Sequence, residues 1–270
     1  MPELPEVETV KNTLKKQILN RKILLSNVYW DNIIAYPEVS VFKEKIKNQK
    51  INDILRRGKW LMFELDDYFL LSHLRMEGKY FIRNKDDEKN KHEHVTFLFD
   101  DDSELRYHDT RKFGKMYLLD KDMVYDVKPL NELGLEPWDK NLNYKYLKLK
   151  FNKKSVKTLL LDQSIITGIG NIYADEVLFL SKIHPEKSGD KLSEKNLEDI
   201  IKYTKVVLER AIEFGGTTVK SYTSSEGVHG SFQNELLVHT KSVCPNCNSE
   251  ILKIIVGGRG TYYCPKCQKR

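Results

Sequence analysis

The chain has 270 residues, which suggests roughly two domains, and its 40% hydrophobic and 31% charged residues support folded cores and exclude a disordered or collagen-like chain. The net charge of +6 permits a polyanionic partner without requiring one. No apolar stretch approaches the roughly twenty residues that span a bilayer, and the first residues are acidic rather than basic, so we expect neither secretion nor membrane association.

The first residues combine a penultimate proline with acidic side chains. An initiator methionine before a small residue such as Pro2 is normally removed, which would leave a secondary amine at the terminus. About a tenth of an α-amine with a pKa of about 7.7 to 8 is unprotonated at neutral pH, so this amine can attack a sugar aldehyde carbon and form an iminium. Glu3 would then be placed to move protons. The alternative is that proline and acids only begin a helix.

Residues 5–18 place apolar side chains at helical spacing and predict an amphipathic helix. From about residue 22 to 119 the pattern changes to short β-rich runs separated by acidic or polar turns, which predicts a sandwich or barrel rather than alternating β and α units. The clearest runs are 23–29, 60–65, 68–73, 95–99 and 115–119.

Helical periodicity dominates from about residue 134 to 214, so we expect a linker near 130–140. The clearest helix has Ser193 as its N-cap and ends at Gly215-Gly216. Before it, two glycines precede Asn171 at another predicted helix start, where backbone amides can hold a phosphate, although such helix entries are common. Residues 215–231 are rich in Gly, Ser and Thr and predict a mobile loop of the length that is usually functional.

The last thirty residues carry a net charge of +5 and all four cysteines. Two Cys-Pro-x-Cys turns separated by sixteen residues predict a zinc ribbon with one structural Zn²⁺, because four thiolates leave no open coordination position; the ligands are Cys244, Cys247, Cys264 and Cys267. Two disulfides or a redox pair are the alternatives. The segment between the turns carries Arg259 among three glycines, which is either a phosphate-binding loop or a simple glycine turn.

Six motifs in this order closely resemble those of the bacterial formamidopyrimidine-DNA glycosylases. The motifs are Met1 to Val10, Arg56-Arg57-Gly58-Lys59, His73-Leu74-Arg75-Met76, Asp109 to Gly114, Gly168 to Tyr173, and Gly258-Arg259-Gly260 with the cysteines. The resemblance implies an α+β fold: an N-terminal β-sandwich with flanking helices (1–132), a helix-two-turn-helix domain (133–235) and a zinc ribbon (236–270). It also implies excision of oxidised purines, chiefly 8-oxoguanine and formamidopyrimidines, followed by β,δ-elimination.

Carried over residue by residue, the resemblance makes Pro2 the nucleophile at the sugar C1′ and Glu3 the general acid. Lys59 matches a lysine that donates a proton in β-elimination, and would otherwise be a solvated basic residue. Arg259 matches an arginine that grips phosphates and acts in δ-elimination, and Asn171 matches an asparagine that binds the same DNA backbone.

A second set of matches concerns the space left when the damaged nucleotide is flipped out. Met76, Arg111 and Phe113 match the residues that fill it, although Met76 and Phe113 could be ordinary core residues and Arg111 a charge at a strand end. His92 matches a DNA-backbone contact. A metal site at His92 and His94 is the alternative, but no third ligand is evident nearby.

Two departures and two rival functions remain. The segment from His239 to Val243 is shorter than in the family and lacks its Tyr-Gly pair, and the loop at 217–231 shows no signature for the choice of lesion. The rivals are an endonuclease VIII-like glycosylase for oxidised pyrimidines, against which Leu4 and the Met76, Arg111 and Phe113 set argue, and a non-catalytic zinc-ribbon DNA-binding protein. The expected partner is double-stranded DNA with oxidised bases or abasic sites, bound by a cytoplasmic, nucleoid-associated monomer.

Overall fold

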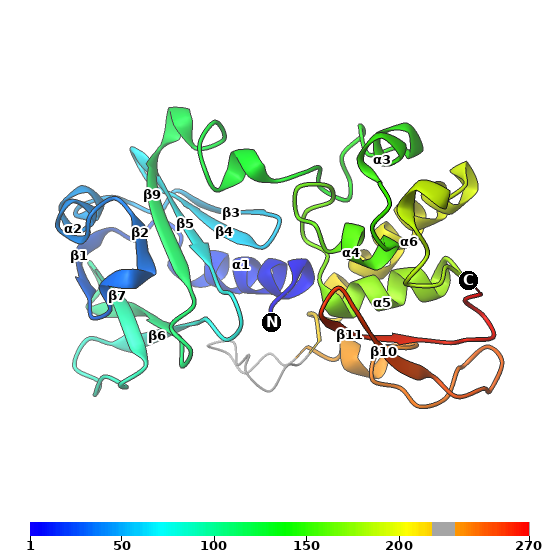
Figure 1. The fold of residues 1–270 in the computed structure, drawn as a ribbon. Coiled ribbons are helices and arrows are strands. Elements are labelled where there is room, and N and C mark those ends of the chain that lie inside the picture. Colours follow the sequence, from blue (N-terminus) through cyan, green and yellow to red (C-terminus); the bar gives the residue numbers. More distant parts are fainter. Residues whose placement is uncertain (218–229, 270) are drawn as a thin grey trace. The chain divides into compact units, whose positions relative to one another are not determined.

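The computed structural model describes residues 1–217 and 230–269 (Figure 1). These residues form two compact units, one built from residues 1–131 with Thr217 and Gly230, the other from the remaining described residues. None of the described helices combines the length and apolar character that a membrane crossing requires. Most of the loop expected at 215–231 lies outside the described residues.

The first unit contains two β-sheets, as the β-rich runs predict, and two helices. One sheet has the order β1 (Ile23–Val28), β7 (Glu93–Phe99), β8 (Ser103–His108) and β6 (Lys79–Asn84). The other has the order β2 (Ile34–Tyr36), β9 (Lys115–Asp120), β5 (Tyr68–His73), β4 (Trp60–Glu64) and β3 (Asp53–Arg57). Helix α1 (Leu4–Ile18) packs on β3, and helix α2 (Val39–Ile46) packs on β1.

Helix α1 forms because its apolar side chains repeat every three or four residues and therefore share one face. Val7, Val10, Leu14 and Ile18 are almost fully buried on that face and join the core that both sheets line. The expected helix is confirmed, and its start lies at the residue directly after Glu3.

Two of the segments in which the chain crosses between the two sheets lie side by side. Residues 74–78 lead from β5 to β6, and residues 109–114 lead from β8 to β9. Both crossings begin and end at paired residues, because His73 is paired with Lys115 in one sheet and Lys79 with His108 in the other. We call these segments crossing loops A (74–78) and B (109–114).

The second unit is helical, with a β-hairpin at its end. Its helices are α3 (Tyr144–Lys150), α4 (Val156–Leu160), α5 (Asn171–Leu180) and α6 (Glu194–Glu213). As the sequence predicts, the Ser193 side chain caps α6, accepting a hydrogen bond from the Asn196 N–H at 3.2 Å. The hairpin strands β10 (Leu252–Val256) and β11 (Arg259–Tyr263) lie beneath α5, which β11 contacts (Figure 1). Short 3-10 turns cover Asp31–Ile33, Lys121–Met123, Leu130–Glu132, Gly189–Lys191 and Phe232–Asn234.

Strand β8 carries a fully buried arginine that holds the loop between β6 and β7. Arg106 is 1% exposed and donates hydrogen bonds to the carboxylates of Glu93 and Glu104 and to three backbone carbonyls of residues 84–88. Every donor direction of the guanidinium is therefore used inside the protein, which offsets the cost of burying its charge.

Replacing Arg106 by alanine is expected to lower the free energy of unfolding by about 3 to 5 kcal/mol, because the buried Glu93 carboxylate would lose its cation. Urea unfolding followed by circular dichroism measures this loss. The matched control is Arg83→Ala, which removes an exposed guanidinium 4.9 Å from the Phe81 ring and should cost about 1 kcal/mol or less. Equal losses in the two variants would contradict the structural role of Arg106.

Candidate active site and metal centre

Pro2 and Glu3 lie buried at the start of α1, and Glu3 is only 2% exposed. Glu3 is the N-cap residue and forms a capping box with Glu6, whose Oε2 accepts a hydrogen bond from the Glu3 N–H at 2.8 Å. The cap fixes the backbone at Glu3, so the first residues have a defined position although they lie at the end of the chain.

The other oxygen of the Glu6 carboxylate holds a distant segment. Glu6 Oε1 accepts hydrogen bonds from the N–H and the hydroxyl of Thr217, at 2.8 and 3.1 Å. Thr217 is the last described residue before the segment 218–229. One buried carboxylate therefore joins the N-terminal residues to the base of that segment, a link across 211 positions that the sequence analysis missed.

Glu8 ties α1 to the hairpin that carries Lys59. Arg56 Nε donates to Glu8 Oε2 at 2.7 Å, and Arg56 Nη1 donates to the Gly58 carbonyl at 3.1 Å. Burial raises the pKa of the Glu8 carboxyl, but the hydrogen bonds and charges of Lys11 and Arg56 outweigh it and lower the pKa below its usual value. Glu8 is thus an ionised link between helix and hairpin, and not merely a charge that suits the helix dipole.

Lys59 occupies the second position of the two-residue turn between β3 and β4, where Arg57 is paired with Trp60. It is only 5% exposed, so the alternative that it is a solvated basic residue is wrong. A buried ammonium group on a tight turn has a restricted position, which suits a residue that delivers a proton.

Crossing loop A carries Met76 and directly follows His73, a histidine that stays neutral. The Arg75 N–H donates to His73 Nδ1 at 3.0 Å, and the His73 ring packs edge-on against Trp60. Burial, with the charges of Arg75 and Lys59, lowers the pKa of His73 to about 3. Met76 is half-buried and therefore not an ordinary core residue.

Crossing loop B carries Arg111 and Phe113, and its backbone is fixed by hydrogen bonds to the Asp109 side chain. The buried Asp109 carboxylate accepts hydrogen bonds from the N–H groups of Arg111, Phe113 and Gly114, at 2.8 to 3.0 Å. The Arg111 guanidinium lies 4.8 Å from the centre of the Phe113 ring, and the Phe113 side chain is 50% exposed. A large aromatic side chain is thus presented to solvent by a rigid loop, and Phe113 is not a core residue.

His92 is half-buried, and its ring centre lies 5.6 Å from that of His108. His94 is buried, and its Nε2 lies 2.9 Å from the carbonyl oxygen of Asp109. The two histidines therefore have different partners. Within residues 1–217 and 230–269 the cysteines form the only cluster suited to a metal, so a metal site at His92 and His94 is not supported.

Asn171 and Arg259 belong to distant parts of the sequence that meet in the second unit. Asn171 is the first residue of α5, and its Nδ2 donates to the Gly260 carbonyl at 2.9 Å. Asn171 Oδ1 is buried without a hydrogen-bond partner in the described chain. Arg259, next to Gly260, is exposed and directly follows a two-glycine turn in which both φ angles are positive, at 55° and 75°. The start of α5 and the part of the hairpin that carries Arg259 are thus neighbours in the second unit.

A buried ionic network in this unit was not predicted from the sequence. Lys157 and Asp175 form an ion pair whose side chains are both fully buried. The second Asp175 oxygen lies 2.7 Å from the ring nitrogen Nδ1 of His239 and accepts a hydrogen bond from the Tyr262 N–H at 3.2 Å. His239 begins the segment that departs from the family pattern, and the network connects this segment to α4, α5 and the hairpin.

Two further side chains attach the ribbon to α5 and to the residues just after it. The Glu176 carboxylate accepts hydrogen bonds from the N–H groups of Leu237, Val238 and His239, at 2.8 to 3.0 Å. Gln268 accepts from the Cys264 N–H and donates to the Ile183 carbonyl, both at 2.9 Å. The ribbon is therefore part of the second unit and not a separately tethered module.

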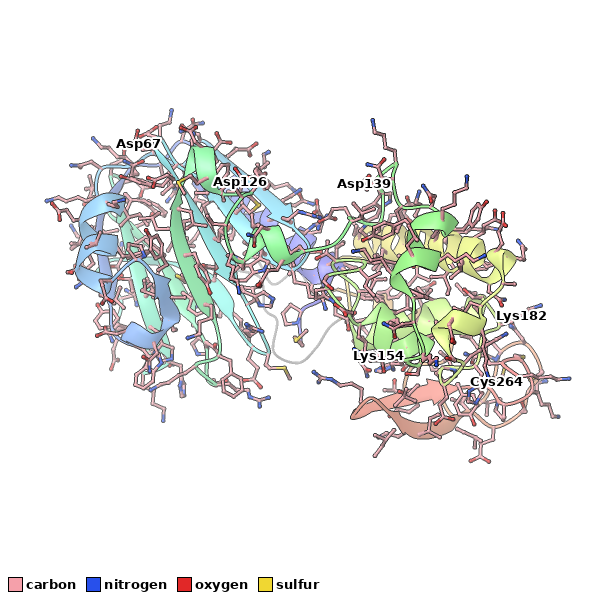
Figure 2. All side chains as sticks on the ribbon, turned by 45° about the horizontal axis from the view of Figure 1, so that its top comes forward. Asp67, Asp126, Asp139, Lys154, Lys182 and Cys264 are labelled. Atoms are coloured by element: carbon pink, nitrogen blue, oxygen red, sulfur yellow. The ribbon has the colours of Figure 1, made fainter. Side chains whose placement is uncertain are left out.

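The four cysteines have the geometry of a zinc site. All four Sγ atoms lie within 4.8 Å of one another, and no disulfide joins them. A tetrahedral site with Zn–S distances of about 2.3 Å requires sulfur atoms about 3.8 Å apart. The Cys244–Cys267 and Cys247–Cys264 pairs are 3.8 and 3.5 Å apart, so the residues fit one Zn²⁺ ion. Cys264 directly follows β11 (Figure 2), so the metal would fix the end of the hairpin.

Comparisons with known families match nearly the whole chain. Residues 1–116 match the formamidopyrimidine-DNA glycosylase N-terminal domain, and residues 133–223 match the H2TH domain of the same glycosylases. Residues 241–270 match a zinc finger found in FPG and IleRS.

Individual relatives are similar over their full length. A formamidopyrimidine-DNA glycosylase of Oceanobacillus iheyensis is 48% identical, covering 99% of this chain and 98% of its own, and one of Shouchella clausii is 46% identical, covering 100% of both. A Lactococcus lactis Fpg in complex with abasic-site DNA has 40% identity and a TM-score of 0.92, covering 99% of this chain and 100% of its own. The same enzyme with N7-benzyl-Fapy-dG DNA gives a TM-score of 0.93, with 40% identity and full coverage of both chains.

The cysteine geometry predicts one zinc ion per chain, measurable by inductively coupled plasma mass spectrometry. Cys264→Ser should lose most of the zinc and lower the thermal unfolding temperature, because a ribbon of this size has no sufficient core of its own. Ser249→Ala is the matched control, since Ser249 Oγ lies 2.8 Å from Cys247 Sγ without belonging to the four-cysteine cluster. Full zinc content in Cys264→Ser would contradict the assignment.

The depressed pKa of His73 predicts a pH-dependent stability. Because the pKa falls from 6.5 to about 3 on folding, the folded protein binds the proton more weakly, so stability is full above pH 6.5 and declines as the pH falls towards 3. His73→Asn keeps an acceptor for the Arg75 N–H but cannot titrate. Urea unfolding of both proteins between about pH 7.5 and about pH 4.5 should show the parent losing up to about 1.4 kcal/mol per pH unit relative to the variant. Parallel curves would refute this effect.

Proposed function

The chain belongs to the formamidopyrimidine-DNA glycosylase family, and on that premise we propose that it binds duplex DNA containing oxidised purines, excises the damaged base and cuts the strand at the abasic site. The observation that carries the proposal is the position of Pro2 and Glu3, buried at a capped helix start that an Arg56–Glu8 ion pair ties to the hairpin bearing Lys59. Nucleophile, acid and cation thus belong to connected elements of one unit.

The nucleophile is the secondary amine of Pro2 after removal of Met1. Its lone pair forms a bond to the sugar C1′, while the electron pair of the glycosidic bond leaves with the base, which takes up a proton. Opening of the sugar ring gives an iminium between Pro2 and C1′. Loss of a C2′ proton then expels the 3′ phosphate, and loss of the C4′ proton in a second elimination expels the 5′ phosphate. The free amine returns when the iminium exchanges or hydrolyses.

Three other side chains serve these steps. Glu3 protonates the sugar as its ring opens and carries protons afterwards, and its burial keeps competing water away from the carboxyl group. Lys59 donates a proton in β-elimination. Arg259, exposed on the hairpin, binds the phosphates beside the lesion and assists δ-elimination.

The remaining site residues hold the DNA open and in register. Met76, Arg111 and Phe113 on the crossing loops fill the space left by the extruded nucleotide. His92 and Asn171 contact the DNA backbone, and Asn171 does so from the N-terminus of α5, where the helix dipole favours a phosphate. Zinc takes part in no step; the four cysteines would use it to fix the hairpin that carries Arg259.

The proposed site of action follows from the substrate. Oxidised purines arise in chromosomal DNA, so the enzyme works in the bacterial cytoplasm at the nucleoid, as a single chain on each lesion. The residues 1–132, 133–235 and 236–270 are the proposed catalytic, helical and zinc-ribbon segments.

Borohydride trapping tests the proposal. Protein shown by mass spectrometry to lack Met1 should form a covalent complex with a duplex that contains 8-oxoguanine, because reduction fixes the iminium. Pro2→Gly should trap far less while still binding the duplex in a gel-shift assay, since a primary amine on a flexible residue replaces a preorganised secondary one.

Each result has a defined meaning. Binding without trapping by processed parent protein would refute the glycosylase and favour a non-catalytic DNA-binding protein. Preferential trapping on oxidised pyrimidines would favour an endonuclease VIII-like specificity.

A further inference from the structure

The two crossing loops that carry Met76, Arg111 and Phe113 both end at a buried glycine beside the same tyrosine. Loop A ends at Gly78 and loop B ends at Gly114, and both glycines are buried. Tyr107 lies on β8, two residues before loop B begins, and is fully buried in the sandwich core. Because the loops begin and end at paired residues, a side chain at this point of β8 can reach the backbone of both.

The hydroxyl group of Tyr107 is packed between the two glycines. A Cβ atom placed on either Gly78 or Gly114 would lie under 3.0 Å from the Tyr107 hydroxyl oxygen, a distance that real Cβ atoms essentially never show. Only glycine therefore allows both loops to approach the same oxygen. Burial and the nearby Asp109 carboxylate raise the pKa of Tyr107 well above its usual value, so the hydroxyl keeps its proton.

Hydrogen bonds also connect the two loops to each other and to the surroundings of the Tyr107 hydroxyl. Tyr107 Oη lies 3.5 Å from Asp109 Oδ2, the oxygen that accepts the N–H groups of Phe113 and Gly114. Within loop A, the Gly78 N–H donates to the Leu74 carbonyl at 2.9 Å and closes the turn that contains Met76. On the outer side, the Thr110 hydroxyl of loop B donates to the Glu77 carboxylate of loop A.

We infer that Tyr107 is a positioning residue that makes crossing loops A and B one rigid body, so that Met76, Arg111 and Phe113 enter the DNA together. This inference rests on the proposed function of the three side chains. Filling the space of an extruded nucleotide requires all of them at once, and holding them in place beforehand avoids an ordering cost during base extrusion. Tyr107 itself touches neither the DNA nor the reacting atoms.

The test compares two substrates that differ in their need for the loops. A duplex with 8-oxoguanine requires base extrusion, whereas a single strand that already carries an abasic site has no base pair to open. Tyr107→Phe should lower the single-turnover excision rate on the duplex about three- to tenfold, the effect of one lost hydrogen-bonding group, and leave borohydride trapping on the single strand unchanged.

Tyr80→Phe is the matched control for loss of a buried hydroxyl. Tyr80 is paired with Tyr107 across β6 and β8, and their ring centres lie 5.2 Å apart, but its hydroxyl donates to Ser72 Oγ at 2.7 Å and not to Asp109. It should lose stability as Tyr107→Phe does without the selective loss of duplex excision. Normal duplex excision by Tyr107→Phe, or an equal selective loss in Tyr80→Phe, would overturn the inference.

A second pair of variants avoids the core altogether. Glu77→Ala and Glu77→Gln both remove a negative charge near the DNA, but only the glutamine can still accept the Thr110 hydrogen bond. Duplex excision should therefore be slower in Glu77→Ala than in Glu77→Gln, with equal trapping on the single strand. Identical rates on the duplex would count against coupled loops, whereas a parent protein that traps neither substrate would refute the proposed function itself.

Discussion

Buried backbone N–H groups that lie outside helices and strands need hydrogen-bond acceptors. In this chain, the oxygens of buried carboxylates accept several of these hydrogen bonds. Glu6 accepts from Glu3 and Thr217, Asp109 from three residues of crossing loop B, and Glu176 from three residues at the start of the ribbon. Each carboxylate holds a segment that bears proposed functional side chains. The irregular parts of the site are thus as firmly anchored as its strands.

The basic side chains fall into two groups: some are buried in ion pairs and stabilise the fold, and others are exposed and available to bind DNA. Arg106 and Lys157 are almost completely buried and paired with carboxylates, so they add nothing to an external field. Arg259 and Arg111 are exposed on a hairpin and on a crossing loop. A count of basic residues therefore overstates the charge available for DNA, and the exposed ribbon arginine contributes more than the modest net charge suggests.

The four-cysteine site and the proposed nucleophile Pro2 lie at opposite ends of the chain and in different units. Asn171, Asp175 and Glu176 hold the ribbon to α5, and Gln268 holds it to Ile183 just after that helix. The segment 239–243, which departs from the family pattern, still contacts the helices because His239 Nδ1 lies 2.7 Å from the second oxygen of Asp175.

The sequence alone determined the features that depend on local spacing: the cysteine pairs, the amphipathic α1, the capped α6 and the order of the motifs. It did not reveal the strands β3, β6 and β8, whose charged side chains hide the alternation, nor the burial of Lys59 and Arg106. Tertiary structure alone placed Glu6 beside Thr217, Tyr107 between two glycines and Asp175 between Lys157 and His239. The hydrogen-bond partners of these buried polar groups are residues that only folding brings close. A buried polar group therefore produces no periodic pattern in the sequence, because residues far along the chain determine its environment.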